Sequence, residues 1–162
     1  MFLDPDVGVA AAGATTPANS NDCRRLLVVD GDSGFVTLAR AAGKRLGFMV
    51  EATSQARELA RIYDSFMPSV IVFDFFTVGM DGIELMNWLH DRNSDAHVIL
   101  TSKKESFFLG VARELAVAKG YLNVETLVEP QGSAAVSDLL IQRLSNVEGR
   151  KAEPGKYPLE KN

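Results

Sequence analysis

The chain has 162 residues, of which 46% are hydrophobic and 23% are charged, and its formal net charge is −4. These proportions are typical of a globular protein with a buried core, and they exclude a chain that is disordered throughout. The mildly acidic balance gives no electrostatic reason to expect a nucleic-acid partner. No apolar run reaches the length of a membrane span, and the single cysteine, Cys23, rules out an intrachain disulfide framework. We therefore expect a cytoplasmic protein that contacts neither membrane nor nucleic acid.

The two ends of the chain differ in composition from its middle. Residues 1–23 are small and polar without a periodic apolar pattern, and residues 148–162 combine many charges with two prolines. Such composition leaves little to bury. We expect an N-terminal tail at 1–23, one folded domain at 24–147 with no room for a second, and a charged C-terminal tail at 148–162.

The middle of the chain alternates between short apolar runs and segments of helical periodicity. In chain order the sequence predicts a strand at 25–30, a helix opened by Ser33, a strand at 48–52, a helix opened by Ser54, a strand at 69–74, a helix opened by Asp81, a strand at 97–101, a helix over about 104–119, a strand at 124–128 and a last helix opened by Ser133. Right-handed crossovers between parallel strands place helices on both faces of a sheet. The order therefore predicts a doubly wound α/β domain with a five-stranded parallel sheet, or (βα)5.

Two of the apolar strands end in a carboxylate, Asp30 and Asp74. Binding sites in this architecture lie at the carboxyl ends of the strands, and a buried carboxylate is costly without a partner. Helix capping is the plainer explanation, especially for Asp30. The functional explanation is that both side chains point into one crevice, where close carboxylates share a proton or hold a divalent cation.

Four motifs in the middle segment carry a resemblance to a known family. They are LLVVDGDSGF at the first strand, VIVFDFFTVGMDGIEL around the third, VILTS at the fourth and LVEP after the fifth. The segment resembles the receiver domains of two-component response regulators, which implies their flavodoxin-like fold. The resemblance implies that Asp74 accepts a phosphoryl group from a histidine kinase and that Thr101 contacts that group. It also implies a magnesium ion held by Asp30, Asp32, Asp74 and Phe76.

The sequence departs from the family pattern at several positions. The second acidic metal ligand of the family falls on Gly31, and the lysine that follows the fifth strand falls on Glu129. Asp30, Asp74 and Glu129 would then crowd one crevice without a cation from the protein. Like charges held near one another should raise the pKa of at least one of these carboxyl groups. Because Gly31 brings no metal ligand, we expect weak magnesium binding.

These features predict an atypical, stand-alone receiver that acts in phosphorelay signal transduction through protein–protein interaction and is not an enzyme. Phosphorylation of Asp74 is expected to be weak or absent. The alternative is a phospho-accepting regulator that uses Asp74 and magnesium, with Asp32 replacing the missing ligand. A third hypothesis, metal-assisted hydrolysis in the acidic crevice, has no evident general base in the sequence to support it.

The expected partners are a histidine kinase or another signalling protein. The resemblance also implies a contact face for a partner or a homodimer, formed by the fourth helix, the fifth strand and the fifth helix. Phe107 and Phe108 lie near the start of that fourth helix. We expect one of them to pack inward and the other to leave an apolar spot on this face.

Overall fold

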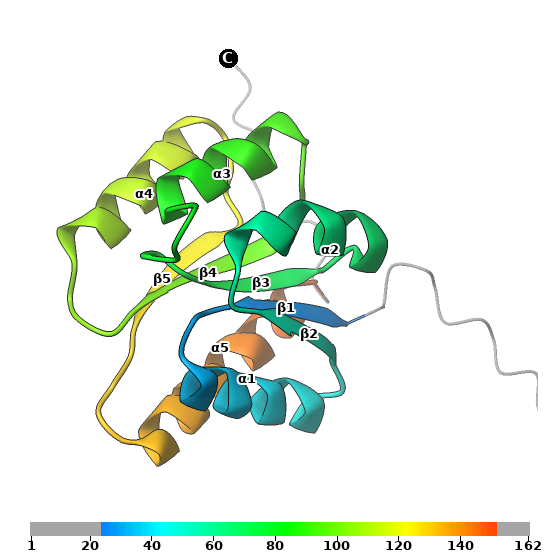
Figure 1. Cartoon of the computed structure of the whole chain (residues 1–162), viewed down its shortest axis with the longest axis vertical. Helices are drawn as coiled ribbons and strands as arrows, with labels where there is room; N and C mark the ends of the chain where they lie inside the picture. The colour runs from blue at the N-terminus through cyan, green and yellow to red at the C-terminus, as the bar shows by residue number, and fades with distance from the viewer. Residues whose placement is uncertain (1–23, 152–162) are drawn as a thin grey trace, which may run out of the picture.

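The computed structural model describes residues 24–151, so Cys23, the expected tail at 1–23 and residues 152–162 lie outside the described part. The elements along the chain are β1 (Arg25–Val29), α1 (Ser33–Arg45), β2 (Met49–Thr53), the short 3-10 helix η1 (Ala56–Glu58), α2 (Leu59–Phe66), β3 (Val70–Asp74), α3 (Gly82–Asp91), β4 (His97–Ser102), α4 (Phe107–Ala118), β5 (Val124–Val128) and α5 (Ser133–Lys151). The five strands form one parallel sheet in the order β2-β1-β3-β4-β5 (Figure 1). This architecture confirms the predicted doubly wound α/β fold.

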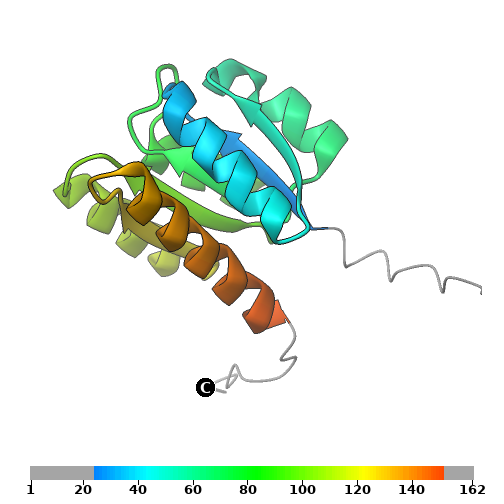
Figure 2. The same ribbon diagram turned by 90° about the horizontal axis from the view of Figure 1, so that it is seen from below.

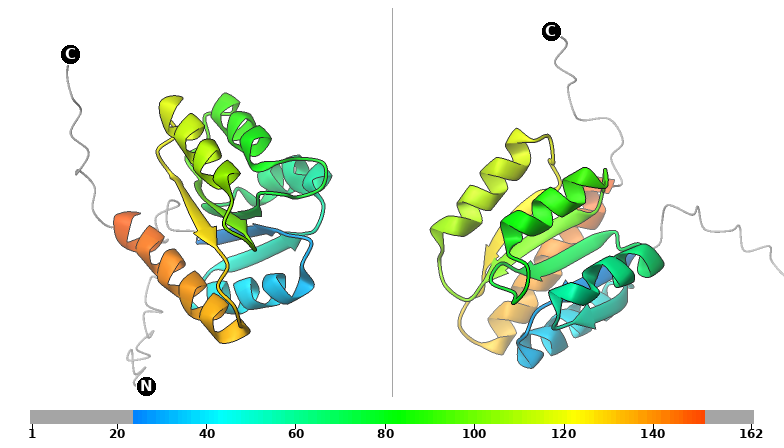
Figure 3. Two further views of the ribbon diagram at one scale, coloured as in Figure 1. Left: turned by 90° about the vertical axis from the view of Figure 1, so that its left-hand side faces the viewer. Right: turned by 45° about the horizontal axis from the view of Figure 1, so that its top comes forward.

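Helices cover both faces of the sheet. Helices α2, α3 and α4 lie on one face (Figure 3), and α1 and α5 lie side by side on the other (Figure 2). Each face has its own apolar core, and both cores draw on the same central strands. The middle residues of β1, β3 and β4 form continuous apolar runs in the sequence because they are buried on both sides.

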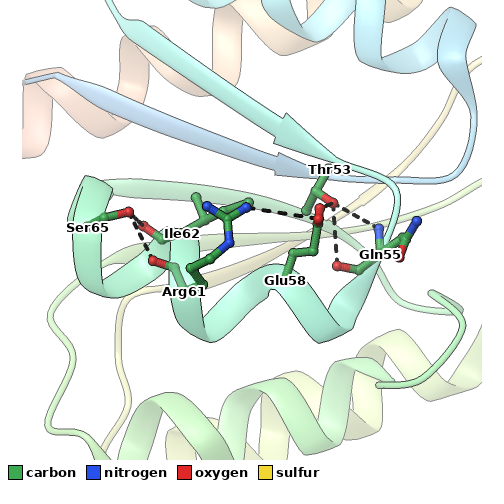
Figure 4. Close-up of polar contacts among 6 residues, drawn as sticks. All are labelled: Thr53, Gln55, Glu58, Arg61, Ile62 and Ser65. Atoms are coloured by element: carbon green, nitrogen blue, oxygen red, sulfur yellow. Dashed lines mark hydrogen bonds and ion pairs between the residues drawn. The ribbon is translucent and has the colours of Figure 1, made fainter.

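The connection from β2 to α2 differs from the prediction that Ser54 caps the helix. Figure 4 shows that Thr53, the last residue of β2, organises the turn instead. Its hydroxyl oxygen accepts from the Gln55 N–H at 3.1 Å and donates to the Glu58 carboxylate at 2.5 Å. The strand therefore ends one residue later than expected, and the chain passes through η1, whose N-cap is Gln55, before α2 begins.

The start of α1 also differs from the prediction. Asp32, and not Ser33, is the N-cap, because its carboxylate accepts from the backbone N–H groups of Gly34 and Phe35 at 2.9 and 3.2 Å. The predicted cap of α3 is confirmed. Asp81 forms a capping box in which its side chain and that of Glu84 each bond the other residue's backbone N–H.

The last two helices have bounds that differ from those predicted. Helix α4 begins at Phe107, after a Ser106 N-cap, about three residues later than expected. Helix α5 runs past Val147 to Lys151, into the expected C-terminal tail. An ion pair between Glu148 and Arg24, with 3.0 Å between nitrogen and oxygen, holds this end of α5 beside the start of β1.

Within residues 24–151, no helix combines the length and apolar character needed to cross a bilayer.

Candidate functional site

The strand register brings the predicted acceptor and its neighbours together at one edge of the sheet. Asp74 at the end of β3 lies directly beside Thr101 on β4. Val29 on β1 pairs with Phe73 on β3. The next residues along these strands, Asp30 and Asp74, are therefore neighbours at the carboxyl ends.

The same residues share one face of the sheet. Side chains alternate between the two faces along a strand. Four apolar residues lie two positions before Asp30, Asp74, Thr101 and Glu129 in the chain. All four pack toward α1 and α5, and they are Val28, Val72, Ile99 and Leu127. The alternation therefore places Asp30, Asp74, Thr101 and Glu129 on the side of the sheet that α1 and α5 cover.

Asp30 is the most deeply buried of the carboxylates, with 2% of its surface exposed. One carboxylate oxygen accepts from the Asp32 N–H at 2.7 Å, while the other is buried without a hydrogen-bond partner. Burial disfavours the charged form and raises the pKa of Asp30 to about 6, and the charge of Asp74 adds to this effect. Asp30 therefore presents an unpartnered oxygen at the crevice.

Asp32 does not join Asp30 and Asp74 as a free metal ligand. One of its oxygens caps α1, and the other pairs with the Lys103 ammonium at 2.5 Å. The hydrogen bond from Lys103 and the backbone N–H of Phe35 hold the pKa of Asp32 below its ordinary value. Asp32 would have to give up this pairing before it could replace the ligand that is absent at Gly31.

The loop after β3 holds Asp74 through its backbone. One Asp74 carboxylate oxygen accepts from the Phe76 N–H at 3.2 Å, and the Asp74 carbonyl accepts from the Thr77 hydroxyl at 2.7 Å. The Phe76 ring carries no ligand atom and is 55% exposed. Phe76 can therefore contribute only its main-chain carbonyl to a metal ion.

Thr101 is fully buried, and its hydroxyl oxygen has no hydrogen-bond partner. Buried polar atoms without partners are uncommon in folded proteins, and each one needs an explanation. Because Thr101 lies beside Asp74, its hydroxyl can donate a hydrogen bond to a group attached to the Asp74 carboxylate. The contact between Thr101 and that group stays a prediction, and the strand register places the two residues side by side.

Glu129 lies at the same edge, where its backbone N–H continues the sheet by donating to the Ser102 carbonyl at 2.9 Å. Partial burial is the main reason that the pKa of Glu129 rises to about 7, and the charges of Asp30 and Asp74 add to it. The prediction that crowding raises the pKa of a carboxyl group is confirmed in direction. Burial is, however, a larger cause than repulsion between like charges.

Lys103, which sequence reasoning missed, supplies a positive charge at this edge of the sheet. The prediction that the carboxylates crowd one crevice without a cation from the protein is therefore wrong. Lys103 follows Thr101 by two residues and pairs with Asp32. This pairing raises the pKa of Lys103, and its charge opposes the raised pKa values of Asp30 and Glu129. A lysine just beyond a strand that ends at the predicted site was the available signal.

The residues present fit magnesium only in part. Among residues 24–151, no three histidine, cysteine, aspartate or glutamate side chains gather so that they could hold a metal ion. The free oxygen of Asp30, the carboxylate of Asp74 and the main-chain carbonyl of Phe76 are the available donors. Magnesium is often bound by one or two carboxylates together with water. These donors therefore suit a weaker site than a set with a further carboxylate.

Phe107 and Phe108 are both exposed, at 81% and 53%, so the prediction that one of them packs inward is wrong. Helix α4 begins at Phe107, and its buried positions recur at Leu109, Ala112 and Ala116. This spacing leaves both phenylalanines outside the buried stripe of the helix. The Phe108 ring stacks outside the acceptor loop, with its centroid 6.2 Å from that of Phe75.

Comparison with known proteins places the chain in a family. The model of the response regulator receiver domain matches residues 26–123. The photosynthetic apparatus regulatory protein RegA of Rhodobacter capsulatus is 31% identical over 101 residues, which cover 62% of this chain and 54% of RegA, so the chain spans about half of its length.

Solved structures show the same fold. A response regulator from Colwellia psychrerythraea is 27% identical, with a TM-score of 0.58 over 76% of this chain and 98% of that one. The beryllofluoride-activated NtrC4 receiver domain dimer is 20% identical, with a TM-score of 0.63 over 78% of this chain and 98% of that one. With its motifs and parallel sheet, the chain belongs to the response regulator receiver domain family.

Proposed function

We propose that this chain is an atypical receiver of cytoplasmic phosphorelay signalling that accepts a phosphoryl group only weakly at Asp74 and is not an enzyme. It transmits its signal mainly by contact with a histidine kinase or another signalling protein. The observation that carries this proposal is the position of Asp74 beside the unpartnered hydroxyl of Thr101, in a crevice whose metal ligands are incomplete.

The chemistry of acceptance follows from these two residues. An Asp74 oxygen attacks the phosphorus of the donor, and the bond from phosphorus to the leaving group breaks, with the electron pair departing on that group. The Thr101 hydroxyl donates a hydrogen bond to an oxygen of the transferred group. A magnesium ion held by Asp30, Asp74 and the Phe76 carbonyl would neutralise part of the charge on the transferred group.

Two features weaken this reaction. Gly31 brings no carboxylate, and Asp32 is occupied by its cap and its ion pair. Glu129, with a pKa of about 7, is partly ionised at neutral pH and would repel a phosphoryl group. At roughly 5 Å and an effective dielectric constant near 20, each pair of unit charges interacts by about 3 kcal/mol. These costs favour slow phosphorylation.

Mass spectrometry after incubation with acetyl phosphate tests the proposal. We expect slow, partial gain of one phosphoryl group that requires magnesium and disappears in Asp74→Asn. Rapid, complete labelling would instead support the alternative, an efficient phospho-accepting regulator. A label that persists in Asp74→Asn would show that Asp74 is not the acceptor.

We place the partner contact on the face formed by α4, β5 and α5. Its exposed apolar side chains support this assignment, and they include Phe107 at the start of α4 and Val128 at the end of β5. Such side chains gathered on one face mark interaction surfaces. Light scattering tests self-association: Phe107→Ser should shift a dimer toward monomer, whereas Met49→Ser, on the far edge strand β2, should not. Equal effects of both variants would exclude this face as the dimer contact.

A further inference from the structure

We propose that Lys103 supplies the positive charge for a phosphoryl group on Asp74, in place of the lysine that is absent at Glu129. The inference rests on the proposed function, in which Asp74 accepts that group. It assigns a phosphoryl-binding role to a residue of the β4–α4 loop. Glu129, the carboxylate that follows β5, then has no part in holding the phosphoryl group.

The strand order is the first argument. Strand β3 lies between β1 and β4 in the sheet. Lys103 follows β4, and its ammonium meets Asp32, which follows β1. A bridge between these two loops therefore crosses the end of β3, where Asp74 lies.

The shape of the β4–α4 loop is the second argument. The buried Ser102 hydroxyl donates to the Lys104 carbonyl at 2.7 Å and accepts from the Lys104 N–H at 3.3 Å. These two bonds fix a turn with Lys103 at its apex. From this turn the Lys103 side chain reaches Asp32, and its charge lowers the pKa values of Asp30 and Glu129.

The weakness of the present ion pair is the third argument. The side chains of Lys103 and Asp32 are 61% and 36% exposed, and exposed ion pairs contribute little to stability. A phosphoryl group carries nearly two negative charges and offers three acceptor oxygens. The flexible Lys103 ammonium can therefore leave Asp32 for the phosphoryl oxygens at little cost.

The step that Lys103 assists conserves atoms and charge. With acetyl phosphate as donor, an Asp74 carboxylate oxygen forms a bond to phosphorus. The bond between phosphorus and the acetate oxygen breaks, and acetate leaves with the electron pair. Lys103 stays protonated and binds the oxygens of the phosphoryl group before and after transfer.

The test compares Lys103→Met with Lys104→Met, which removes a neighbouring exposed lysine from the same loop. Both are made in the wild-type chain and in Gly31→Asp, in which an added metal ligand strengthens the reaction. The readouts are the initial rate of Asp74 labelling by acetyl phosphate with magnesium, the lifetime of the label and the unfolding midpoint of each variant.

We expect Lys103→Met to lower the labelling rate about 10-fold and to shorten the lifetime of the label, with Lys104→Met close to the parent chain. Lys103→Arg should keep most of the rate, and adding Glu129→Lys to Lys103→Met should restore it. Equal rates in Lys103→Met and Lys104→Met would overturn the role of Lys103 and leave the proposed function standing. Absence of label on Asp74 in both backgrounds would overturn both.

Discussion

The ring of Phe75 lies so close to Gly82 that a methyl group on Gly82 would be 2.4 Å from a ring carbon. Phe75 directly follows Asp74, and its carbonyl accepts from the Gly82 N–H at 3.1 Å. The glycine of the Met80-Asp81-Gly82 motif is thus required by packing. It lets the acceptor loop close against the first turn of α3.

Gly82→Ala should destabilise the domain by about 1–3 kcal/mol, because the buried Phe75 ring cannot move without disturbing the core. Urea unfolding measures the change. Gly110→Ala on α4 is the matched control, since a methyl group there meets nothing within 4 Å. It should increase the free energy of unfolding by about 0.5–1 kcal/mol, because alanine favours a helix more than glycine does. A Gly82→Ala variant as stable as the wild type would contradict this packing argument.

Glu129 should make stability depend on pH near neutrality. Its pKa is about 7 in the folded chain against 4.5 ordinarily, so the folded state binds more protons between these values. Stability should therefore fall as pH rises through this window, by on the order of 1–3 kcal/mol, and level off above it.

Glu129→Gln removes this titration and should be more stable than the wild type at about pH 8, with a flatter profile down to about pH 5. Asp30, with a pKa of about 6, should leave a residual slope at the lower end. Unfolding curves across this pH range measure the effect, and Glu114→Gln, an exposed carboxylate on α4, serves as control. If the stability of Glu129→Gln and of the wild type changed in parallel with pH, Glu129 would not be the source of the pH dependence.

Gly31→Asp should strengthen magnesium binding about 10-fold by adding a carboxylate to the donors. A side chain fits there, because a Cβ on Gly31 meets nothing within 4 Å. Calorimetric titration gives the affinity, and Gly31→Asn matches the size of aspartate without its charge. Tight magnesium binding by the wild-type chain would instead favour Asp32 as the replacement ligand.

Two variants of Asp32 separate its roles as helix cap and ion-pair partner. Asp32→Asn keeps a good N-cap and loses only the exposed pair with Lys103, so it should cost less than about 1 kcal/mol. Asp32→Ala loses both and should cost about 1 kcal/mol more. Chemical denaturation of the two variants measures the difference. Equal stabilities would show that the carboxylate does not cap α1 in solution.

The fold could be predicted because its signals are local and agree with one another. Strands β1, β3 and β4 each contain a continuous apolar run, and strong turn and capping residues such as Asp81 separate them from the helices. The ends of elements were less certain, because several polar residues next to each other can serve as the cap. At α1 the choice between Asp32 and Ser33 depended on which side chain reaches the free N–H groups.

The site could be predicted in part for a similar reason. Asp30, Asp74 and Thr101 end apolar strands, so the register alone brings them together. Lys103 could not be assigned in this way. Its long side chain can point in many directions, and only the turn held by Ser102 shows that it crosses to Asp32.

The ion pair between Arg24 and Glu148 has a practical consequence for experiments. Both residues lie at the amino ends of the strands, at the edge opposite the acidic crevice. An affinity tag or fluorescent label attached outside residues 24–151 is therefore joined to the domain far from Asp74. The first strand and the last helix, which this ion pair joins, share any load that such an attachment transmits to the domain.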